Sequence, residues 1–435
     1  MGKAVRIVIL LIVLLLGLAS SEASAASNNV YVLRAKGTIT PVLAGYIDRG
    51  LGQCEAEGAA ACVIQLDTPG GLDGPMRDIV QRILNAKVPV IVYVSPAGAR
   101  AASAGTFITM AGHIAAMAPN TAIGAAHPVF LGSSGEPQET EKTLEEKATN
   151  DAVAYIKSIA TERKRNADWA ESAVRESVSA NEKDALALNV IDVVAPDLPS
   201  LLAQLDGREV SLLSGPTTLQ LKEANIVYVN MNPIESFLFT ISDPNIAYIL
   251  LSLAMTGIFL ELSNPGAILP GVVGGLCLLL GLYSLGTLPV NWAGVLLIGF
   301  AFVLFVAEVF VTSHGLLALG GVASLALGSL ILTAGNPPFL AIDPRLIGGV
   351  VAIITILFAI VIRAVVRTQR QRPVTGREAL IGKMATVRTP LKPMGTVFLQ
   401  GEIWRAKSEE GEVESGEEVI INRVEGLELW VTKNK

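Results

Sequence analysis

The chain has 435 residues, of which 51% are hydrophobic and 17% are charged, and its formal net charge is −6. A soluble domain of average composition is less apolar and more highly charged. Since the balance is acidic and no basic stripe is interleaved with aromatic residues, we expect no nucleic-acid partner. Three cysteines and three scattered histidines predict no zinc site, and we expect no metal and no cofactor.

The first 25 residues have the three parts of a secretory signal. Lys3 and Arg6 form a positive region, residues 7–18 are an apolar core, and Ala23-Ser-Ala25 is a small-residue cleavage site. An uncleaved anchor helix is the alternative. In either case the segment that follows is expected outside the cytoplasm.

Strand-like and helix-like segments alternate between residues 28 and 225. The expected strands are 29–33, 60–66, 88–94, 115–118 and 122–125, and the expected helices are 40–57, 74–85, 103–110 and 142–163. This alternation predicts one α/β domain with a mainly parallel sheet. Cys54 and Cys62 fall in this domain, where a disulfide is permitted but not required.

Ser103 follows the strand-like run 88–94 in a turn of small residues. A serine at a tight strand-to-helix turn can be exposed as a nucleophile. Gly70 and Gly71 end the preceding strand-like run, and their N–H groups, with that of Ala104, could stabilise an oxyanion. The pattern predicts acyl transfer, most simply peptide hydrolysis. The alternatives are a helix N-cap at Ser103 and ordinary turn glycines.

A second apolar block, at 245–367, predicts a membrane domain. Its candidate spans are 246–262, 268–286, 293–312, 316–334 and 346–366. Each is near the length needed to cross a bilayer. A four-span or re-entrant arrangement stays open, because the second and fourth candidates are short and rich in glycine.

The charges around these spans predict the topology. Arg363, Arg367 and Arg370 crowd the end of the last span, which places the C-terminal tail in the cytoplasm and the first domain outside. An odd number of spans is then required, which favours five. Glu261 and Glu308 lie near predicted span ends, where an interfacial position is expected.

Residues 376–435 show period-two alternation with regular glycine turns, which predicts a small five-stranded barrel. Phe398, Trp404 and Trp430 are its only large aromatic residues, and the module is rich in acid. We interpret it as a protein-interaction module, with a stabilising appendage as the alternative.

Several motifs together resemble a known family. Asp67-Thr-Pro-Gly-Gly71, Ala102-Ser-Ala-Gly105 and Ile123-Gly-Ala-Ala-His-Pro128 look like those of ClpP/crotonase-type serine proteases. The order of signal, α/β domain, spans and β tail is similar to that of the long NfeD-type membrane proteases. The resemblance implies a ClpP-like protease domain at 28–225 and an OB-like tail. It also implies cleavage within apolar stretches of membrane-associated proteins, and a stomatin-like partner. We expect a homo-oligomer.

Two residues compete for the role of general base. Lys147 lies where NfeD-type proteases carry their catalytic lysine, and a lysine can act as a base when burial favours its neutral form. His127 lies where ClpP carries its histidine, but the position that matches the ClpP acid is nearest to Arg175, with Glu176 beside it. We therefore favour a Ser103–Lys147 dyad. The polar run 132–141 is either a lid or a connector.

Two other classes of function remain. One is a non-catalytic membrane scaffold with a vestigial protease domain. The other is a crotonase-like acyl-CoA enzyme, which export past a signal peptide disfavours.

Overall fold

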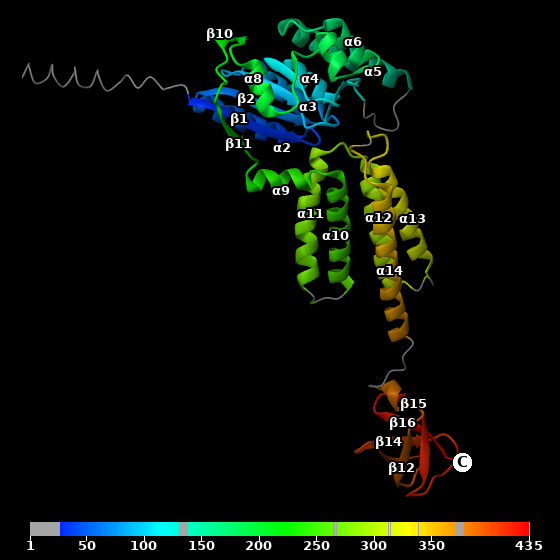
Figure 1. Ribbon diagram of the computed structural model, residues 1–435. Coiled ribbons are helices and arrows are strands. Elements are labelled where there is room, and N and C mark those ends of the chain that lie inside the picture. The colour runs from blue at the N-terminus through cyan, green and yellow to red at the C-terminus, as the bar shows by residue number, and fades with distance from the viewer. Residues whose placement is uncertain are drawn as a thin grey trace, which may run out of the picture. The chain divides into compact units, whose positions relative to one another are not determined.

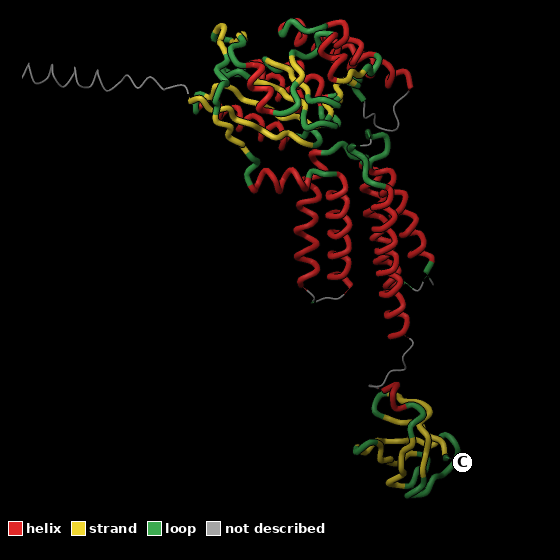
Figure 2. Tube along the Cα trace, viewed as in Figure 1, coloured by secondary structure: helices red, strands yellow, loops and turns green. Residues whose placement is uncertain are grey.

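A computed structural model describes residues 27–129, 138–263, 266, 268–311, 313, 315–337, 339–369 and 377–434 (Figures 1 and 2). The predicted signal at 1–25, and most of the run 132–141, lie outside these residues. The chain divides into two compact units, the first ending at Ile354 and the second beginning at Thr355.

A six-stranded sheet forms the centre of the first unit, with strand order β11-β1-β2-β3-β5-β8. Its strands are β1 (Ser27–Lys36), β2 (Ala59–Asp67), β3 (Val90–Val94), β5 (Ile114–Met117), β8 (Val193–Val194) and β11 (Asn225–Val229). Every neighbouring pair is parallel. All five residues of β3 are buried, as is typical of a parallel sheet that is covered on both faces. The predicted α/β domain with a mainly parallel sheet is confirmed.

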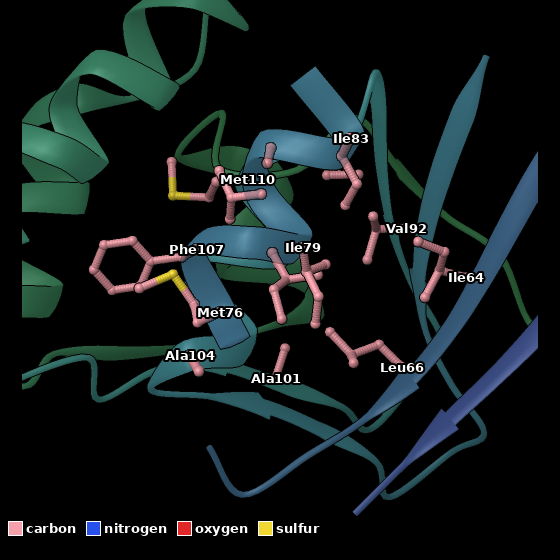
Figure 3. Packing of buried hydrophobic residues seen from close by; sticks show 14 of the residues in the cluster. Ile64, Leu66, Met76, Ile79, Ile83, Val92, Ala101, Ala104, Phe107 and Met110 are labelled. Carbon is pink, nitrogen blue, oxygen red and sulfur yellow. The ribbon is translucent and has the colours of Figure 1, made fainter. Parts of the chain in front are cut away.

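Helices pack against both faces of this sheet. Their bounds are α2 (Pro41–Ala56), α3 (Asp73–Leu84), α4 (Ala104–Ala111), α5 (Gln138–Glu162), α6 (Ala167–Arg175), α7 (Glu182–Ala187) and α8 (Leu198–Leu205). On one face Ile64 and Val92 pack with Ile79 of α3 and Met110 of α4 (Figure 3). Since side chains alternate along a strand, Val63 lies in the second core, on the face covered by α8.

Cys54 of α2 and Cys62 of β2 are free thiols, and both are buried. Burial, together with a hydrogen bond to the Cys54 thiol, raises the pKa of Cys62 well above its ordinary value. A buried thiol that keeps its proton is a poor nucleophile. The disulfide that the sequence permits is therefore not formed in this structure.

Two smaller sheets complete the domain. β4 (Arg100–Ala102), β6 (Ala122–Gly124) and β7 (Ser179–Asn181) form a three-stranded sheet, and β9 (Glu209–Leu212) and β10 (Gly215–Thr218) form a hairpin. β4 pairs with β6 in parallel register, with Ala102 opposite Gly124. This pairing places the residue after β4, which is Ser103, beside the end of β6.

The short helix α9 (Pro233–Ile241) connects the domain to the apolar helices. Asn232 and Glu235 form a capping box at its N-terminus, which satisfies two backbone N–H groups. Glu235 also pairs with Arg49 of α2 at 2.7 Å. Ile234 and Phe237 are 70% and 51% exposed.

Five apolar helices follow: α10 (Pro244–Ser263), α11 (Ile268–Thr287), α12 (Trp292–Phe310), α13 (Leu316–Leu332) and α14 (Pro344–Gln369). Four of them are long and apolar enough to cross a membrane. The 17 residues of α13 are about 25 Å long, somewhat less than a hydrocarbon core of about 30 Å. A multispan helical membrane domain is confirmed, and the count of five spans stays a prediction.

Glycines let these helices approach each other closely. A methyl group on Gly257 of α10 would lie 2.6 Å from the Pro270 carbonyl oxygen of α11, and one on Gly294 of α12 would lie 2.6 Å from the Leu332 backbone of α13. Such contacts between small residues stabilise helix pairs in lipid. Glu308, near the end of α12, accepts hydrogen bonds from the N–H groups of Gly315 and Ala318 at 2.8 and 3.1 Å and so caps α13.

The second unit contains a closed five-stranded barrel with strand order β12-β13-β14-β16-β15. A 3-10 turn (Arg377–Leu380) precedes β12 (Met384–Thr389), β13 (Met394–Leu399), β14 (Glu402–Ser408), β15 (Glu418–Glu425) and β16 (Glu428–Lys433). Val387, Val397 and Leu429 are among the residues that fill it. On its outside Lys407 and Arg423 lie 4.3 and 4.6 Å from the centre of the Trp430 ring. The predicted small barrel is confirmed.

Candidate active site

Ser103 lies in the tight turn between β4 and α4 with φ of 52° and ψ of −116°. This backbone conformation favours glycine, so a serine there is strained and must be held by its surroundings. The Ser103 N–H donates to the Gly124 carbonyl at 3.0 Å. Its side chain makes no capping hydrogen bond to α4, so Ser103 does not act as the side-chain cap that the sequence left open. The turn instead presents a half-buried hydroxyl.

Thr106 holds this turn in place, which the sequence did not predict. Its hydroxyl is fully buried and lies 3.0 Å from the carbonyl oxygens of Ala101 and Gly124. It also accepts a hydrogen bond from the Gly124 N–H at 3.1 Å. One side chain of α4 therefore ties β4 to β6 beside Ser103. The sequence offered one indication of this role, since Thr106 is a polar residue among the small and apolar residues that begin the helix.

The backbone at Gly70 and Gly71 approaches neighbouring residues so closely that only glycine fits at these positions. Gly70 has a φ of 124°, and a methyl group on it would lie 2.8 Å from Ser103 Cβ and 3.3 Å from Ser103 Oγ. A methyl group on Gly71 would lie 2.3 Å from the Ile39 carbonyl oxygen. The Gly70–Gly71 backbone therefore fits between Ser103 and Ile39 only because both positions lack a side chain.

The two glycines differ in what their N–H groups do. The Gly70 N–H donates to the Thr68 hydroxyl at 3.1 Å. In contrast, within the described residues no protein acceptor binds the N–H of Gly71 or that of Ala104. Ala104 begins α4, where N–H groups have no partner in the helix and the dipole favours negative charge. Gly71 and Ala104 thus fit the oxyanion donors, whereas the Gly70 N–H is already engaged.

His127 has a carboxylate neighbour that the sequence did not predict. Its Nδ1 lies 2.9 Å from the Val174 carbonyl oxygen, and its Nε2 lies 3.5 Å from Glu145 of α5. Arg175, at the position nearest to the ClpP acid, is bound instead to Glu171 and Asn150. Among the described residues no hydrogen bond joins His127 to Ser103. The signal that was missed was the acidic run at the start of α5.

Lys147 is exposed on α5, two residues after Glu145. In the part of the chain that the structure describes it forms no ion pair and no hydrogen bond with Ser103. Lys157, another lysine of α5, is bound to Glu171 at 2.5 Å, which raises the pKa of Lys157. A lysine with a raised pKa stays in the ammonium form near neutral pH, and that form cannot accept a proton from a serine.

No group of three or more histidine, cysteine or acidic side chains within the described ranges could hold a metal. His113 is typical of a core histidine, because its Nδ1 accepts the Val90 N–H at 3.2 Å. Burial, together with the nearby guanidinium groups of Arg163 and Arg165, lowers the pKa of His113 to about 3. It is therefore neutral at ordinary pH.

Comparisons with known proteins cover the whole arrangement. Family models match residues 29–196 (NfeD1b, N-terminal domain), 245–364 (NfeD integral membrane domain) and 377–433 (NfeD-like C-terminal, partner-binding domain). The membrane-bound protease PH1510 of Pyrococcus horikoshii is 37% identical over 419 residues, which are 94% of each chain. Membrane protein NfeD1b of Bacillus subtilis is 28% identical over 428 residues, again 94% of each chain. A solved structure, the 1510-N membrane protease specific for a stomatin homolog from Pyrococcus horikoshii, is 38% identical and has a TM-score of 0.44; the match covers 50% of this chain and 100% of that one.

Proposed function

Because the chain belongs to the NfeD family, we propose that it is a membrane-anchored serine endopeptidase that cleaves apolar segments of membrane-associated proteins. The relative with 37% identity is a membrane-bound protease, and the match extends over 94% of both chains. The α/β domain, the membrane helices and the barrel therefore all belong to the shared part.

The observation that carries this proposal is the strained turn at Ser103, beside which the N–H groups of Gly71 and Ala104 have no protein acceptor among the described residues. In the reaction the Ser103 oxygen attacks the peptide carbonyl while a base takes its proton. The carbonyl oxygen becomes an oxyanion, which accepts hydrogen bonds from Gly71 and Ala104. The proton then passes to the leaving amine, and water releases the acyl group from Ser103.

We propose Lys147 as the base, on the strength of its position in the family pattern. Lys147 is exposed in the free chain, so substrate must cover it before it can act. Burial disfavours the ammonium form, so a substrate that expels water from this side chain favours the neutral amine. Most of the run 132–141 lies outside the described residues, and its interpretation as a lid or a connector stays a prediction.

His127 is the second candidate, favoured by its contact with Glu145 at 3.5 Å. A carboxylate beside an imidazole fixes its orientation and stabilises the charge that it gains. In this structure, however, Nε2 faces Glu145. The ring can accept a proton from Ser103 only after it turns away from that contact.

Three variants of the full chain test the assignment with an apolar peptide as substrate. Ser103→Ala and Lys147→Ala are each expected to lower turnover by about three orders of magnitude or more, whereas His127→Ala keeps most of it. Near-normal activity of Ser103→Ala would refute the protease proposal. An active Lys147→Ala together with an inactive His127→Ala would transfer the role of base to the histidine.

The arrangement in the membrane is part of the proposal. We take residues 1–25 as the signal, 28–225 as the extracytoplasmic protease domain, 245–367 as five spans and 376–435 as a cytoplasmic OB-like domain. A single cysteine at Glu414 in a cysteine-free chain should resist an impermeant thiol reagent in intact cells. Labelling there would mean an even number of spans.

The barrel supports the proposal of a protein partner, because this region matches a family model described as partner-binding. We propose a stomatin-like membrane protein as partner or substrate, and a homo-oligomeric protease. The competing proposal is a non-catalytic scaffold for the same partner. Failure of a serine-directed fluorophosphonate to label Ser103 in a folded sample would favour the scaffold.

A further inference from the structure

A cavity of about 510 Å³ lies where the protease domain meets the segments that lead into the apolar helices. Gly37 and Thr38, just after β1, line one side. Phe239 of α9 and Pro244 of α10 line another, and Leu340, between α13 and α14, completes the wall. Phe239, Pro244, Ile246 and Leu340 supply apolar side chains, whereas Thr40, Thr240, Ser242 and Asp243 supply polar ones. An apolar group therefore fits against the apolar part of the wall.

This cavity adjoins the turn that bears the oxyanion donors. Ile39, the residue after Thr38, donates its N–H to the Gly70 carbonyl at 2.9 Å and accepts the Leu72 N–H at 3.0 Å. The backbone that forms one wall is therefore hydrogen-bonded directly to the Gly70–Gly71 turn. The cavity wall and the turn beside Ser103 are thus joined through Ile39.

Phe339 extends this wall to the nucleophile. A methyl group built on Gly70 would lie 3.3 Å from Phe339 Cζ and 3.3 Å from Ser103 Oγ. The edge of the aromatic ring and the hydroxyl thus flank the same point of the Gly70 backbone. Consecutive residues of one connection, Phe339 and Leu340, contact the nucleophile's neighbourhood and the cavity.

Hydrogen bonds hold this connection to the apolar helices. The Asn336 side chain donates to the Pro289 carbonyl at 2.7 Å, between α11 and α12. The Asp343 N–H donates to the Asn245 side chain at 2.9 Å, at the start of α10. Because both ends of the connection are fixed, the Phe339 ring has a defined place at the site.

We infer that Phe339 is a specificity-determining residue, and that the cavity beside it receives an apolar side chain of the substrate next to the scissile bond. The inference rests on the proposed protease function. It means that the membrane domain contributes part of the substrate site. Such an apolar contact changes selectivity by about 10-fold to 200-fold, because a smaller side chain leaves part of the pocket unfilled.

The test uses the full chain in detergent with two pairs of apolar peptides. Each pair differs only by Leu or Ala, on one side or on the other side of the scissile bond. In Phe339→Ala the preference for Leu over Ala, measured as kcat/KM, should fall by about 10-fold or more in one of the pairs. Phe300→Ala is the control, because Phe300 of α12 is 53% exposed; it should keep the wild-type preference.

Thr38→Trp gives an independent reading, because it fills the cavity from the opposite wall. It should lower kcat/KM for the Leu peptide of that pair more than for the Ala peptide, while fluorophosphonate still labels Ser103. An unchanged preference in Phe339→Ala, or an equal change in kcat/KM for both peptides, would overturn the inference. If Ser103→Ala is inactive in the same assay, the protease proposal still stands. Normal cleavage by Ser103→Ala would overturn both.

Discussion

The protease domain and the apolar helices bury different kinds of side chain. All five residues of β3 are buried, whereas Leu296 and Val303 of α12 are 73% and 61% exposed. In water the removal of large apolar side chains from solvent drives folding. In lipid that force is absent, and helices associate through close packing of small residues such as Gly294. The comparison teaches that glycine lets the backbone lie next to Ser103 in one region and lets two helices approach each other in the other.

The largest effect is expected where the protease domain buries a charge. The Arg165 guanidinium is almost fully buried and binds Asp192 at 2.5 Å and the Gly112 carbonyl at 2.9 Å. Arg165→Met removes these bonds and leaves the Asp192 carboxylate poorly compensated, which should cost about 3–5 kcal/mol. Thermal unfolding of the full chain in detergent should show a loss of about 10 °C in the transition of this domain. Lys157→Met breaks only a half-buried pair that solvent still reaches and should leave the transition nearly unchanged; similar losses in both variants would contradict this expectation.

The next effect tests glycine at the catalytic backbone. A methyl group on Gly71 collides with the Ile39 carbonyl oxygen at 2.3 Å, whereas nothing lies within 4 Å of one on Gly74. Gly71→Ala should displace an oxyanion donor and lower kcat by about 100-fold to 1,000-fold. Gly74→Ala is the matched control and should keep nearly full turnover. A fully active Gly71→Ala would remove this residue from the oxyanion hole.

The same substitution in the apolar helices should act on stability. A methyl group on Gly294 would lie 2.6 Å from the Leu332 backbone, while one on Gly299 of α12 meets nothing within 4 Å. Gly294→Ala should destabilise the helix pair by about 1–3 kcal/mol through overpacking. Gly299→Ala should be neutral or stabilising by up to about 1 kcal/mol, because alanine favours the helix. Thermal unfolding in detergent separates the two, and equal behaviour would show that α12 and α13 do not pack at Gly294.

The smallest effect concerns pH and the neutral His113. Its pKa is about 3 in the folded chain against 6.5 as its ordinary value, so the unfolded chain binds the extra proton first on acidification. Stability from this residue is present above pH 6.5 and decreases as the pH falls toward 3. Between pH 7 and pH 6 the loss is about 0.7 kcal/mol. His113→Asn should show a correspondingly smaller decrease in unfolding temperature over this interval; an identical slope would mean that the pKa of His113 is the same in the folded and the unfolded chain.

The positions of most elements could be predicted from the pattern of the sequence. The runs expected at 60–66 and 74–85 became β2 and α3 within one residue at each end, because alternation and helical periodicity report burial locally. The turn at Ser103 was predicted for a similar reason, since its small residues allow a tight connection. The number of spans stays open because α13 has 17 residues and length alone does not decide it.

Contacts between distant segments could not be predicted in this way. Glu145 lies next to His127 because α5 packs against α6, whose Val174 carbonyl holds the His127 ring, and no spacing in the sequence reports that approach. Phe339 reaches the neighbourhood of Ser103 across more than 200 residues of chain. Phe339 lies in the apolar block that predicts a membrane domain, and nothing in the composition of that block indicated that one of its residues lies near Ser103.

The short connection through α9 limits where the protease can cut. Its Glu235 is bound to Arg49 of α2, and only Ser242 and Asp243 separate α9 from α10. The Ser242 hydroxyl donates to the Leu238 carbonyl at 2.8 Å, so this joint is ordered. A domain on a flexible tether samples a wide range of heights above a bilayer, whereas an ordered joint of two residues narrows that range. We therefore expect this chain to cleave its substrates within a restricted distance of the membrane surface.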